Sequence, residues 1–569
     1  MVVKLSLALR LTIWQPRRLG SFHYSFGGQM LQGEFTESQI KILEHFVTST
    51  TSDIFVLYNL PEVVKGALFS RYSRSTLGLR TLLLKEFILN EDTAFAAIAG
   101  KYSDADRSNQ TTAIRKAKSF YDRILDGYGD DSIGELGGAH LAIENISMLA
   151  AKVIEDGRIG GSPLEKSTRY MYFDQKVNGQ YLFYQEPVLM TSAYRDLYLD
   201  TCNHLFDTYS KLIPPLTALI EQGFPKDPAI PKLAYTAALR AKVLDCLRGL
   251  LPASTMTNMG VFGNGRFFET LLQKLNVHNL VEMEDIGKKS YQELSKVIPS
   301  FIRRADPAHK HYQAYAQFFE SMQNNLHQFA AAHTQEVTTL SKPGVRLISY
   351  DPDAPAKVGG ALLFGSTSAA LHELQEYCRH LPPEELARLL ALTCSPRENR
   401  RHKSPRALEH ASFTFEILAD FGVYRDLHRH RILTQERQRL SADHGYYTPP
   451  EIHGTDMEKD YHEAMERAKQ AYDTIASELP EEAQYIVPMA YNIHWYFQVN
   501  LRSLQWLCEL RSQAAGHPTY RLIAQEMARQ VSLALPIFER FFKFVDYDGY
   551  ELGRLNAEIR QEEKAKARS

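Results

Sequence analysis

Apolar side chains recur at steps of three and four residues along much of this chain, which is the spacing of one face of a helix. The segment from Asp456 to Leu479 is the clearest case. Thr455 and Glu458 have the spacing of a capping box at its start, and Pro480 ends it. The pattern therefore predicts a long amphipathic helix. Its apolar face consists of Tyr461, Met465, Ala468, Tyr472, Ile475 and Leu479.

Strands are predicted at only a few places, where apolar and polar residues alternate. They lie near residues 139–148, 168–174 and 411–419. Because long helical segments separate these short runs, the pattern predicts an α+β fold in which long helices surround a small mixed sheet.

Several short motifs occur twice in the same order, which indicates an internal repeat. Leu251-Pro252 and Val487-Pro488 each precede an Asn-x-Arg motif by the same interval, at Asn264 and at Asn500. We interpret this order as a duplicated domain, with copy 1 over 54–330 and copy 2 over 345–555. Turn signals around Lys342-Pro-Gly separate the copies.

The two ends are expected to lie outside this duplicated core. Residues 1–50 are interpreted as an N-terminal arm, because basic residues precede the first acid and an arginine interrupts the apolar run. Residues 556–569 are expected to form a charged, frayed tail.

Composition is that of a globular protein with at least two domains. The chain has 569 residues, of which 44% are hydrophobic and 23% charged, and its net charge is −2. This balance does not favour nucleic acid as a partner. No apolar run is long enough to span a membrane, and no histidine pair has convincing metal-ligand spacing. The five scattered cysteines suit a reducing compartment, so we expect a cytoplasmic protein.

The strongest chemical signal is Arg429-His430-Arg431, which follows the predicted strand at 411–419. Such a basic run is costly to bury without an anionic partner. It could hold a phosphate or an electron-rich cofactor. A solvated basic turn is the alternative.

These motifs resemble the flavin-dependent thymidylate synthases. Copy 2 has most of that family's signature, and copy 1 has the Ser-x-Arg-Tyr segment that copy 2 lacks. The matching segments are His402-Lys-Ser404-Pro405, Glu409-His410, Phe413-Thr-Phe415, Arg429-His430-Arg431, Asn500-Leu-Arg502-Ser503-Leu504 and Arg511 in copy 2, and Glu165-Lys-Ser167-Thr-Arg169-Tyr170 in copy 1.

Each copy departs from the family pattern in a complementary way. Copy 2 has no Ser-x-Arg-Tyr after Arg431. Copy 1 has Asp130 at the place of His402, only Gly157-Arg158 in place of Arg-His-Arg, and Leu275 at the place of Arg511. The resemblance therefore implies composite sites, with motifs divided between the copies. Decay of both copies past catalysis is the alternative.

The resemblance implies FAD-dependent reductive methylation of dUMP, or a related pyrimidine nucleotide, to dTMP. Methylene-tetrahydrofolate would donate the carbon and NADPH would reduce the flavin. Members of this family are homotetramers, so we expect the duplicated chain to form a homodimer that acts as a pseudo-tetramer. The competing hypothesis is an inactive or altered homologue that binds flavin or nucleotide in a scaffold or regulatory role.

The resemblance also assigns roles to residues. Arg429, His430, Arg431 and Asn500 would hold the FAD, and His402 would lie against the flavin as part of the catalytic pocket.

For the nucleotide, Ser167 and Arg169 would bind the phosphate, and Glu165 would orient their loop. Arg511 would polarise the uracil carbonyl. The alternatives are an exposed strand-edge role for Arg169 and a structural salt bridge for Arg511.

Overall fold

The computed structural model describes residues 35–73, 75–88, 134–157, 159–337 and 342–567. They belong to two compact units, Met1–Tyr128 and Gly129–Ser569, and each is treated by itself. Asp130 and Arg158, which entered the comparison of the two copies, lie outside the described residues.

The first unit contains α1 (Glu37–Leu43), α2 (Glu62–Tyr72), α3 (Leu79–Leu82) and the π-helix η1 (Leu83–Ile88). Leu43 and Phe46 are fully buried. Residues 37–46 therefore contribute to a packed core, whereas the sequence had suggested an arm over 1–50. The helical spacing of Ile40 and Leu43 is the signal that this expectation overlooked.

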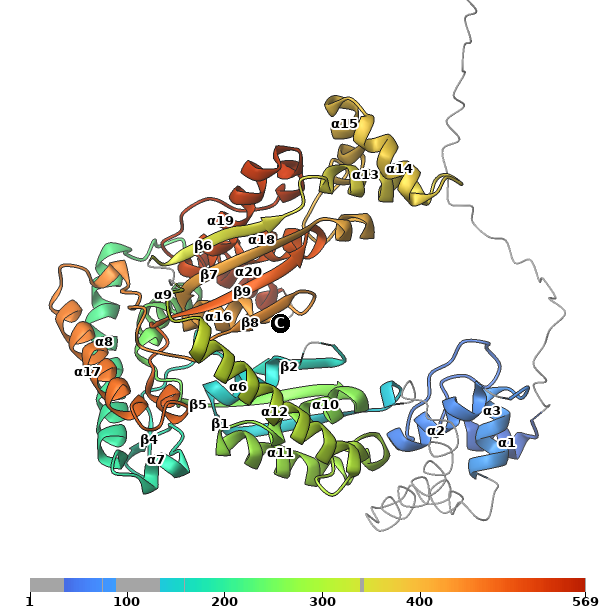
Figure 1. Cartoon of the computed structure of the whole chain (residues 1–569), viewed down its shortest axis with the longest axis horizontal. Helices are drawn as coiled ribbons and strands as arrows, with labels where there is room; N and C mark the ends of the chain where they lie inside the picture. The colour runs from blue at the N-terminus through green and yellow to red at the C-terminus, as the bar shows by residue number, and fades with distance from the viewer. Residues whose placement is uncertain (1–34, 74, 89–133, 158, 338–341, 568–569) are drawn as a thin grey trace, which may run out of the picture. The chain divides into compact units, whose positions relative to one another are not determined.

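The second unit contains two sheets in which three strands follow the same order, and a two-stranded sheet of β3 (Lys176–Val177) and β4 (Gln180–Tyr181) (Figure 1). In the first, β5 (Met256–Asn264) lies between β1 (Gly138–Ser147) and β2 (Gly161–Glu165). In the second, β9 (Asn492–Asn500) lies between β7 (Ser412–Asp420) and β8 (Thr434–Arg437), and β6 (Gly344–Tyr350) extends the edge beside β7. All of these pairings are antiparallel, so the expectation of a mixed sheet was wrong in this detail.

The helices of the two copies also correspond. The equivalent pairs are α6 (Met148–Glu155) with α16 (Phe421–Leu427), α10 (Gly265–Asn276) with α18 (Leu501–Arg511), and α11 (Val281–Leu294) with α19 (Pro518–Ala534). The other α-helices among the described residues of this unit are α7 (Pro187–Thr191), α8 (Arg195–Gly223), α9 (Lys232–Leu247), α12 (Lys310–His333), α13 (Ala354–Phe364), α14 (Leu371–His380), α15 (Pro383–Cys394), α17 (Asp456–Ala476) and α20 (Leu555–Lys566).

Matching caps confirm the repeat at the level of single residues. Asn264 ends β5 and caps α10, where its side chain accepts a hydrogen bond of 2.9 Å from the Phe267 N–H. Asn500 ends β9 and caps α18 through the equivalent 2.9 Å bond from the Ser503 N–H. An asparagine side chain satisfies an otherwise unpaired amide at a helix start. The α+β fold with two tandem copies is therefore confirmed.

The copies meet through equivalent segments. Pro252 pairs with Pro488 in an antiparallel bridge, and the Ala253 N–H donates to the Val487 carbonyl at 2.9 Å. Equivalent residues contact each other in this way when two similar bodies are related by a two-fold axis. In Figure 1, α8 and α17 pack side by side. Both helices also contact η4 (Arg248–Leu250) and η9 (Glu482–Ile486), which precede Pro252 and Pro488. The duplicated domains therefore form an internal pseudo-dimer.

Local predictions differ in outcome. The strands predicted near 139–148 and 411–419 correspond to β1 and β7. The strand predicted at 168–174 was wrong, because β2 pairs with β5 at residues 161–165 and the chain then leaves the sheet in a turn. The amphipathic helix is α17, but its capping box does not form. The Glu458 carboxylate instead accepts the Gly454 N–H at 2.8 Å, and the Thr455 hydroxyl donates to the Ile452 carbonyl.

The charged C-terminal segment is ordered, in contrast to the predicted frayed tail. Residues Leu555–Lys566 form α20, which packs against α9. The Ala234 N–H near the start of α9 donates to the Glu562 carboxylate at 3.2 Å. A carboxylate near a helix N-terminus satisfies free amides and interacts favourably with the helix dipole.

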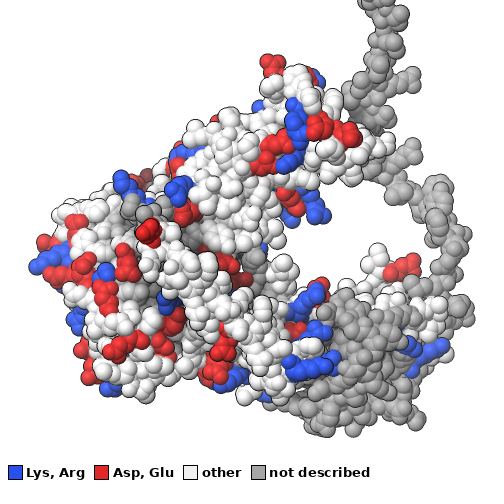
Figure 2. Space-filling model, viewed as in Figure 1, with Lys and Arg blue, Asp and Glu red and all other residues white. Residues whose placement is uncertain are grey.

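The surface carries charges of both signs. On the face seen in Figure 2, acidic and basic side chains lie next to one another at the end of the molecule formed by α8 and α17. Within the described part of the chain, no helix combines the length and apolarity needed to cross a membrane.

Candidate active site between the two copies

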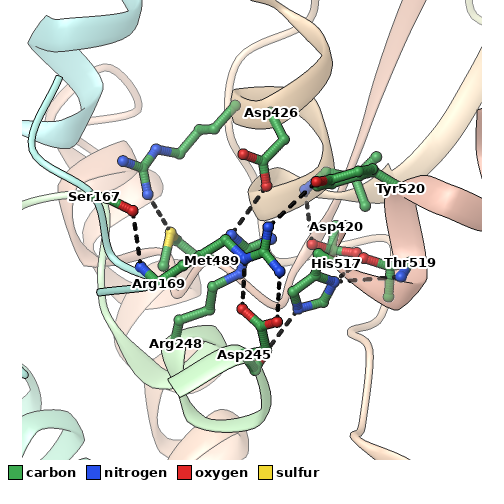
Figure 3. Close-up of polar contacts among 12 residues, drawn as sticks. Ser167, Arg169, Asp245, Arg248, Asp420, Asp426, Met489, His517, Thr519 and Tyr520 are labelled. Carbon is green, nitrogen blue, oxygen red and sulfur yellow. Dashed lines mark hydrogen bonds and ion pairs between the residues drawn. The ribbon is translucent and has the colours of Figure 1, made fainter. Parts of the chain in front are cut away.

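Arg169 and Asp245 form a buried ion pair near the contact between the copies (Figure 3). The Arg169 Nε and Nη2 atoms donate to the two Asp245 oxygens at 2.6 and 2.7 Å. Arg169 also donates to Tyr520 Oη and to the Ala515 carbonyl, both at 3.2 Å and both in copy 2. Burial lowers the pKa of Arg169, but the charge of Asp245 outweighs burial and raises it. Arg169 is therefore a fixed cation and not the exposed strand-edge residue that was the alternative.

Asp426 lies among four arginines that come from both copies. Arg248 Nη1 donates to Asp426 Oδ2 at 3.0 Å. Burial alone would raise the pKa of Asp426. The charge of Arg248, followed by those of Arg169, Arg511 and Arg429, instead holds that pKa well below its usual value. We call Asp426 and these four arginines the arginine cluster.

Gly422, in the first turn of α16, leaves room for the Arg248 side chain to approach this helix. A Cβ atom on Gly422 would lie 2.9 Å from Asp420 Oδ1 and 3.1 Å from Arg248 Nη2. Both distances are shorter than ordinary van der Waals contact, so a side chain here would push the Asp420 carboxylate away and would shift Arg248 by a few tenths of an ångström. The Arg248 Nη2 atom has no hydrogen-bond partner among the described residues.

The predicted cofactor motif lies beside this cluster. His430 Nε2 accepts a hydrogen bond from Arg511 Nε at 2.9 Å. Burial, and then the charge of Arg511, lower the pKa of His430 well below its usual value, so the imidazole is neutral. Arg431 reaches copy 1, where it donates to the Gly161 carbonyl and, at 3.1 Å, to the Ser162 hydroxyl.

Glu165 joins the two halves of the split motif. Its carboxylate accepts from Arg425 Nη2 at 2.7 Å and lies 2.9 Å from Lys152 Nζ and 3.8 Å from Arg429 Nη2. Burial raises the pKa of Glu165, but Arg425 and then Lys152 outweigh burial and lower it. This ionised carboxylate from copy 1 thus anchors the segment that precedes Arg429 in copy 2.

The remaining predicted residues have local roles. The Ser167 hydroxyl accepts the Arg169 N–H at 3.2 Å, next to the cluster. Asn500 is occupied as the cap of α18, about 16 Å along that helix from Arg511. The ring of exposed His402 contacts Asn399 at 3.0 Å within its own loop. The structure therefore brings together Glu165, Ser167, Arg169, Arg429, His430, Arg431 and Arg511, but does not place Asn500 or His402 with them.

Sequence reasoning missed several charged residues of the site, namely Asp245, Arg248, Arg425 and Asp426. A signal for two of them was present. Asp245 and Arg248 lie seven and four residues before Pro252, the proline of the repeated motif. Charges in such an apolar stretch are costly to bury unless they are paired.

Comparison with known proteins supports the duplication. The family model of the thymidylate synthase complementing proteins matches the chain twice, over residues 83–300 and 346–537. The chain belongs to this family. The two matches cover more than half of the sequence and fall on the two structural copies.

Relatives are found at several levels of similarity. A UPF0159 protein of Chlamydia pneumoniae is 57% identical over 529 residues, which cover 93% of this chain and 98% of that protein. A UPF0159 protein of Thermoplasma acidophilum is 33% identical, over 88% of this chain and 99% of the relative. A flavin-dependent thymidylate synthase of Clostridium tetani is 30% identical over 219 residues, which cover 34% of this chain and 83% of that enzyme.

The arrangement has the chemistry of an anion-binding site. Within the described part of the chain, Arg431 and Arg511 contact neutral groups and form no ion pair with a carboxylate. Arg429 is 3.8 Å from its carboxylate partner and 40% exposed. These three cations can therefore accept a phosphate or a polar cofactor edge without first breaking a close ion pair.

Proposed function

We propose that this family member catalyses the FAD-dependent reductive methylation of dUMP to dTMP, with methylene-tetrahydrofolate as carbon donor and NADPH as reductant. One observation carries the proposal. Two arginines of copy 1, Arg169 and Arg248, and two of copy 2, Arg429 and Arg511, lie near enough to Asp426 that their charges hold its pKa low. Motifs that are divided between the copies in sequence thus converge in one composite site.

The residues beside the cluster fit a flavin cofactor. Arg429 and Arg431 would bind its phosphates or carbonyl edge, because their guanidinium groups are accessible and not closely paired with carboxylates. When bound, FAD would supply hydride transfer. Because Arg431 is held by the Gly161 carbonyl, the same arginine would couple cofactor binding to the position of β2.

Arg169 would bind the nucleotide phosphate together with Ser167. The Asp245 carboxylate accepts both guanidinium bonds that a phosphate would take. Asp245 thus holds Arg169 in a defined orientation and competes with the phosphate. Binding of the phosphate would then require a shift of Arg169, or a hydrogen bond from its Nη1 atom, which donates to Tyr520 Oη at 3.2 Å.

Arg511 would stabilise negative charge on the uracil carbonyl. Its partner His430 is neutral, so the hydrogen bond orients the guanidinium without cancelling its charge. A fixed cation at a developing negative charge lowers the barrier electrostatically. We propose that His402 and Asn500 contribute, as first predicted, in the homodimer, where a second chain can complete the flavin pocket.

An inactive or altered flavin- or nucleotide-binding homologue is the second candidate. The close Arg169–Asp245 pair favours it, since this pair neutralises the proposed phosphate ligand. Such a protein could retain the Arg429–Arg431 surface and bind flavin without turning over dUMP.

The absorbance spectrum of the purified chain with added FAD, before and after addition of dUMP, tests the proposal. A bound flavin band that shifts with dUMP, followed by dTMP formation with methylene-tetrahydrofolate and NADPH, is the expected result. Bound flavin without any dTMP would favour the second candidate. Failure to bind flavin under any of these conditions would refute the assignment of FAD as the cofactor, and with it flavin binding in the second candidate. As a matched control, Arg406→Ala removes an exposed arginine outside the cluster and should change neither the spectrum nor turnover.

A further inference from the structure

A cavity lies between the copies, apart from the arginine cluster; α16 contributes to both, because Tyr424 lines the cavity and Asp426 belongs to the cluster. The volume of the cavity is about 470 Å³. We call it the Arg437 pocket. Copy 1 contributes residues from α6 and from the end of α10, and copy 2 contributes residues from α16, β8 and η9 (Glu482–Ile486). Its lining includes Val153, Asp156, Lys274, His278, Gln435 and Arg437.

The Arg437 pocket is related to the arginine cluster by the internal pseudo-symmetry. Glu165 pairs with Met259 on β5, whereas Arg437 pairs with Trp495 at the equivalent position on β9. Arg437 therefore takes the place of Glu165. Glu481, which also lines the pocket, lies seven residues before Pro488, as Asp245 does before Pro252.

Arg439 forms an ion pair with Glu481, the counterpart of Asp245, and its Nη1 atom lies 3.0 Å from Glu481 Oε1. Arg439 stands at the place of Ser167 and not of Arg169, so this ion pair is not the equivalent of the Arg169–Asp245 pair. Unlike that pair, it is largely open to solvent, since the Arg439 side chain is 57% exposed.

The buried side chains of the Arg437 pocket differ from their counterparts in the arginine cluster. Counted from the helix caps Ser147 and Asp420, Val153 is the counterpart of Asp426, and Asp156 is the counterpart of Arg429. The central carboxylate and its arginines are thus replaced by an apolar side chain and an acid. As a result the Arg437 pocket is hollow, whereas in the arginine cluster Asp426 forms an ion pair with Arg248.

The pocket carries cationic and neutral donors. Arg437 Nη1 donates to the Gln438 carbonyl at 3.0 Å, and among the described residues Arg437 forms no ion pair with a carboxylate. Its guanidinium carbon lies 6.0 Å from the centre of the Tyr424 ring. Lys274 Nζ lies 2.8 Å from Asp156 Oδ2, and its side chain is 36% exposed. Arg437 is therefore a cation without an anionic partner, and Lys274 is a second cation close by.

His278 adds a neutral donor. Its Nδ1 atom accepts the Leu280 N–H at 3.1 Å, so Nε2 carries the hydrogen. Burial, then the charges of Lys274 and Arg437, lower the pKa of His278 to about 4. The pocket also contains a free hydrogen-bond acceptor, since the buried Gln435 Oε1 atom has no hydrogen-bond partner among the described residues.

We propose that the Arg437 pocket binds a small organic phosphate. The phosphate would be held by Arg437, Lys274 and the His278 Nε2–H, and a hydroxyl or amino group of the ligand would donate to Gln435. Cavities of about 300–1,000 Å³ are the usual size of small-molecule sites, so a sugar phosphate or a nucleoside monophosphate fits the volume. This site is separate from the proposed catalytic function and does not depend on it.

Calorimetric titration of the full chain with ribose 5-phosphate, and separately with inorganic phosphate and with ribose, tests the proposal. Ribose 5-phosphate should bind, and ribose should not. Arg437→Gln should weaken binding roughly tenfold or more, because it removes a charge-assisted contact. Lys274→Gln, which alters a half-exposed side chain, provides a second variant if Arg437→Gln fails to fold.

Two matched controls separate this pocket from the arginine cluster. Arg439→Gln removes a rim cation already paired with Glu481 and should change the affinity less than Arg437→Gln does. Arg429→Gln, in the cluster, tests for ribose 5-phosphate that binds there instead, and it should change the affinity less than Arg437→Gln does. The proposal is overturned if ribose 5-phosphate does not bind, if Arg437→Gln and Lys274→Gln bind it like the parent, or if only Arg429→Gln weakens it. Failure of the FAD and dUMP experiments would leave these titrations unaffected.

Discussion

Replacement of Asp245 by asparagine should separate the structural role of Arg169 from its proposed role as a phosphate ligand. The two side chains are only 10% and 9% exposed, and two bonds of 2.6 and 2.7 Å join them. Removing one partner of a buried ion pair costs about 3–5 kcal/mol, because the other charge stays buried and unpaired. Asparagine keeps one acceptor oxygen, and Tyr520 and the Ala515 carbonyl remain. We therefore expect a loss at the low end, about 3 kcal/mol.

The ligand dependence of this loss is the informative result. Without the Asp245 charge, Arg169 is free to bind an anion, so dUMP should bind roughly tenfold tighter to Asp245→Asn than to the parent. Because a ligand stabilises the folded state according to its affinity, dUMP should raise the melting temperature of the variant more than that of the parent. Thermal melting with and without dUMP, together with calorimetric titration, measures both effects.

A double variant supplies the control. Combining Asp245→Asn with Arg169→Met removes both buried charges, so much of the lost stability should return, while the extra stabilisation by dUMP should disappear. If dUMP raises the melting temperature of Asp245→Asn no more than that of the parent, Asp245 does not compete with the phosphate. Arg169 would then be a structural residue, and its assignment as a dUMP ligand would be refuted.

Other expected outcomes concern the cofactor, the cap of α16 and the approach of Arg248. Arg431→Ala should abolish flavin binding and leave the far-UV circular dichroism unchanged, because the side chain is exposed; retained flavin absorbance would contradict the cofactor assignment. Burial raises the pKa of the Asp420 carboxyl from 3.8, its value in the unfolded chain, to about 6 in the folded protein. Above about pH 6 the carboxyl is ionised and lowers the stability of the folded state. This loss of stability disappears as the pH falls below 3.8, where the carboxyl is protonated in both states. Asp420→Asn, which keeps an acceptor for the Val423 N–H, should therefore raise the melting temperature at about pH 7.5 and not at about pH 3.5; an equal change at both would show that ionisation is not the cause. Gly422→Ala should shift Arg248 and weaken dUMP binding, and unchanged affinity in a calorimetric titration would exclude Arg248 from the site.

The sequence alone was enough for features that depend on local spacing. The apolar face from Tyr461 to Ile475 predicted α17, because a helix repeats every 3.6 residues whatever surrounds it. The order of Leu251-Pro252 and Asn264 against Val487-Pro488 and Asn500 predicted the repeat. The family motifs likewise identified most of the charged residues that converge between the copies.

Tertiary structure alone decided how these charges are paired. Arg169 and Asp245 are 76 residues apart, and Glu165 and Arg425 are 260 apart, so no local pattern connects them. The strand expected at 168–174 was wrong for the same reason, since the register of β2 is set by its partner β5. The sequence determined which charges the chain carries and that its domain is duplicated. The packing of one copy against the other determined which of those charges are buried, because an ionised group is tolerated in a low-dielectric interior only where the fold provides it with a partner.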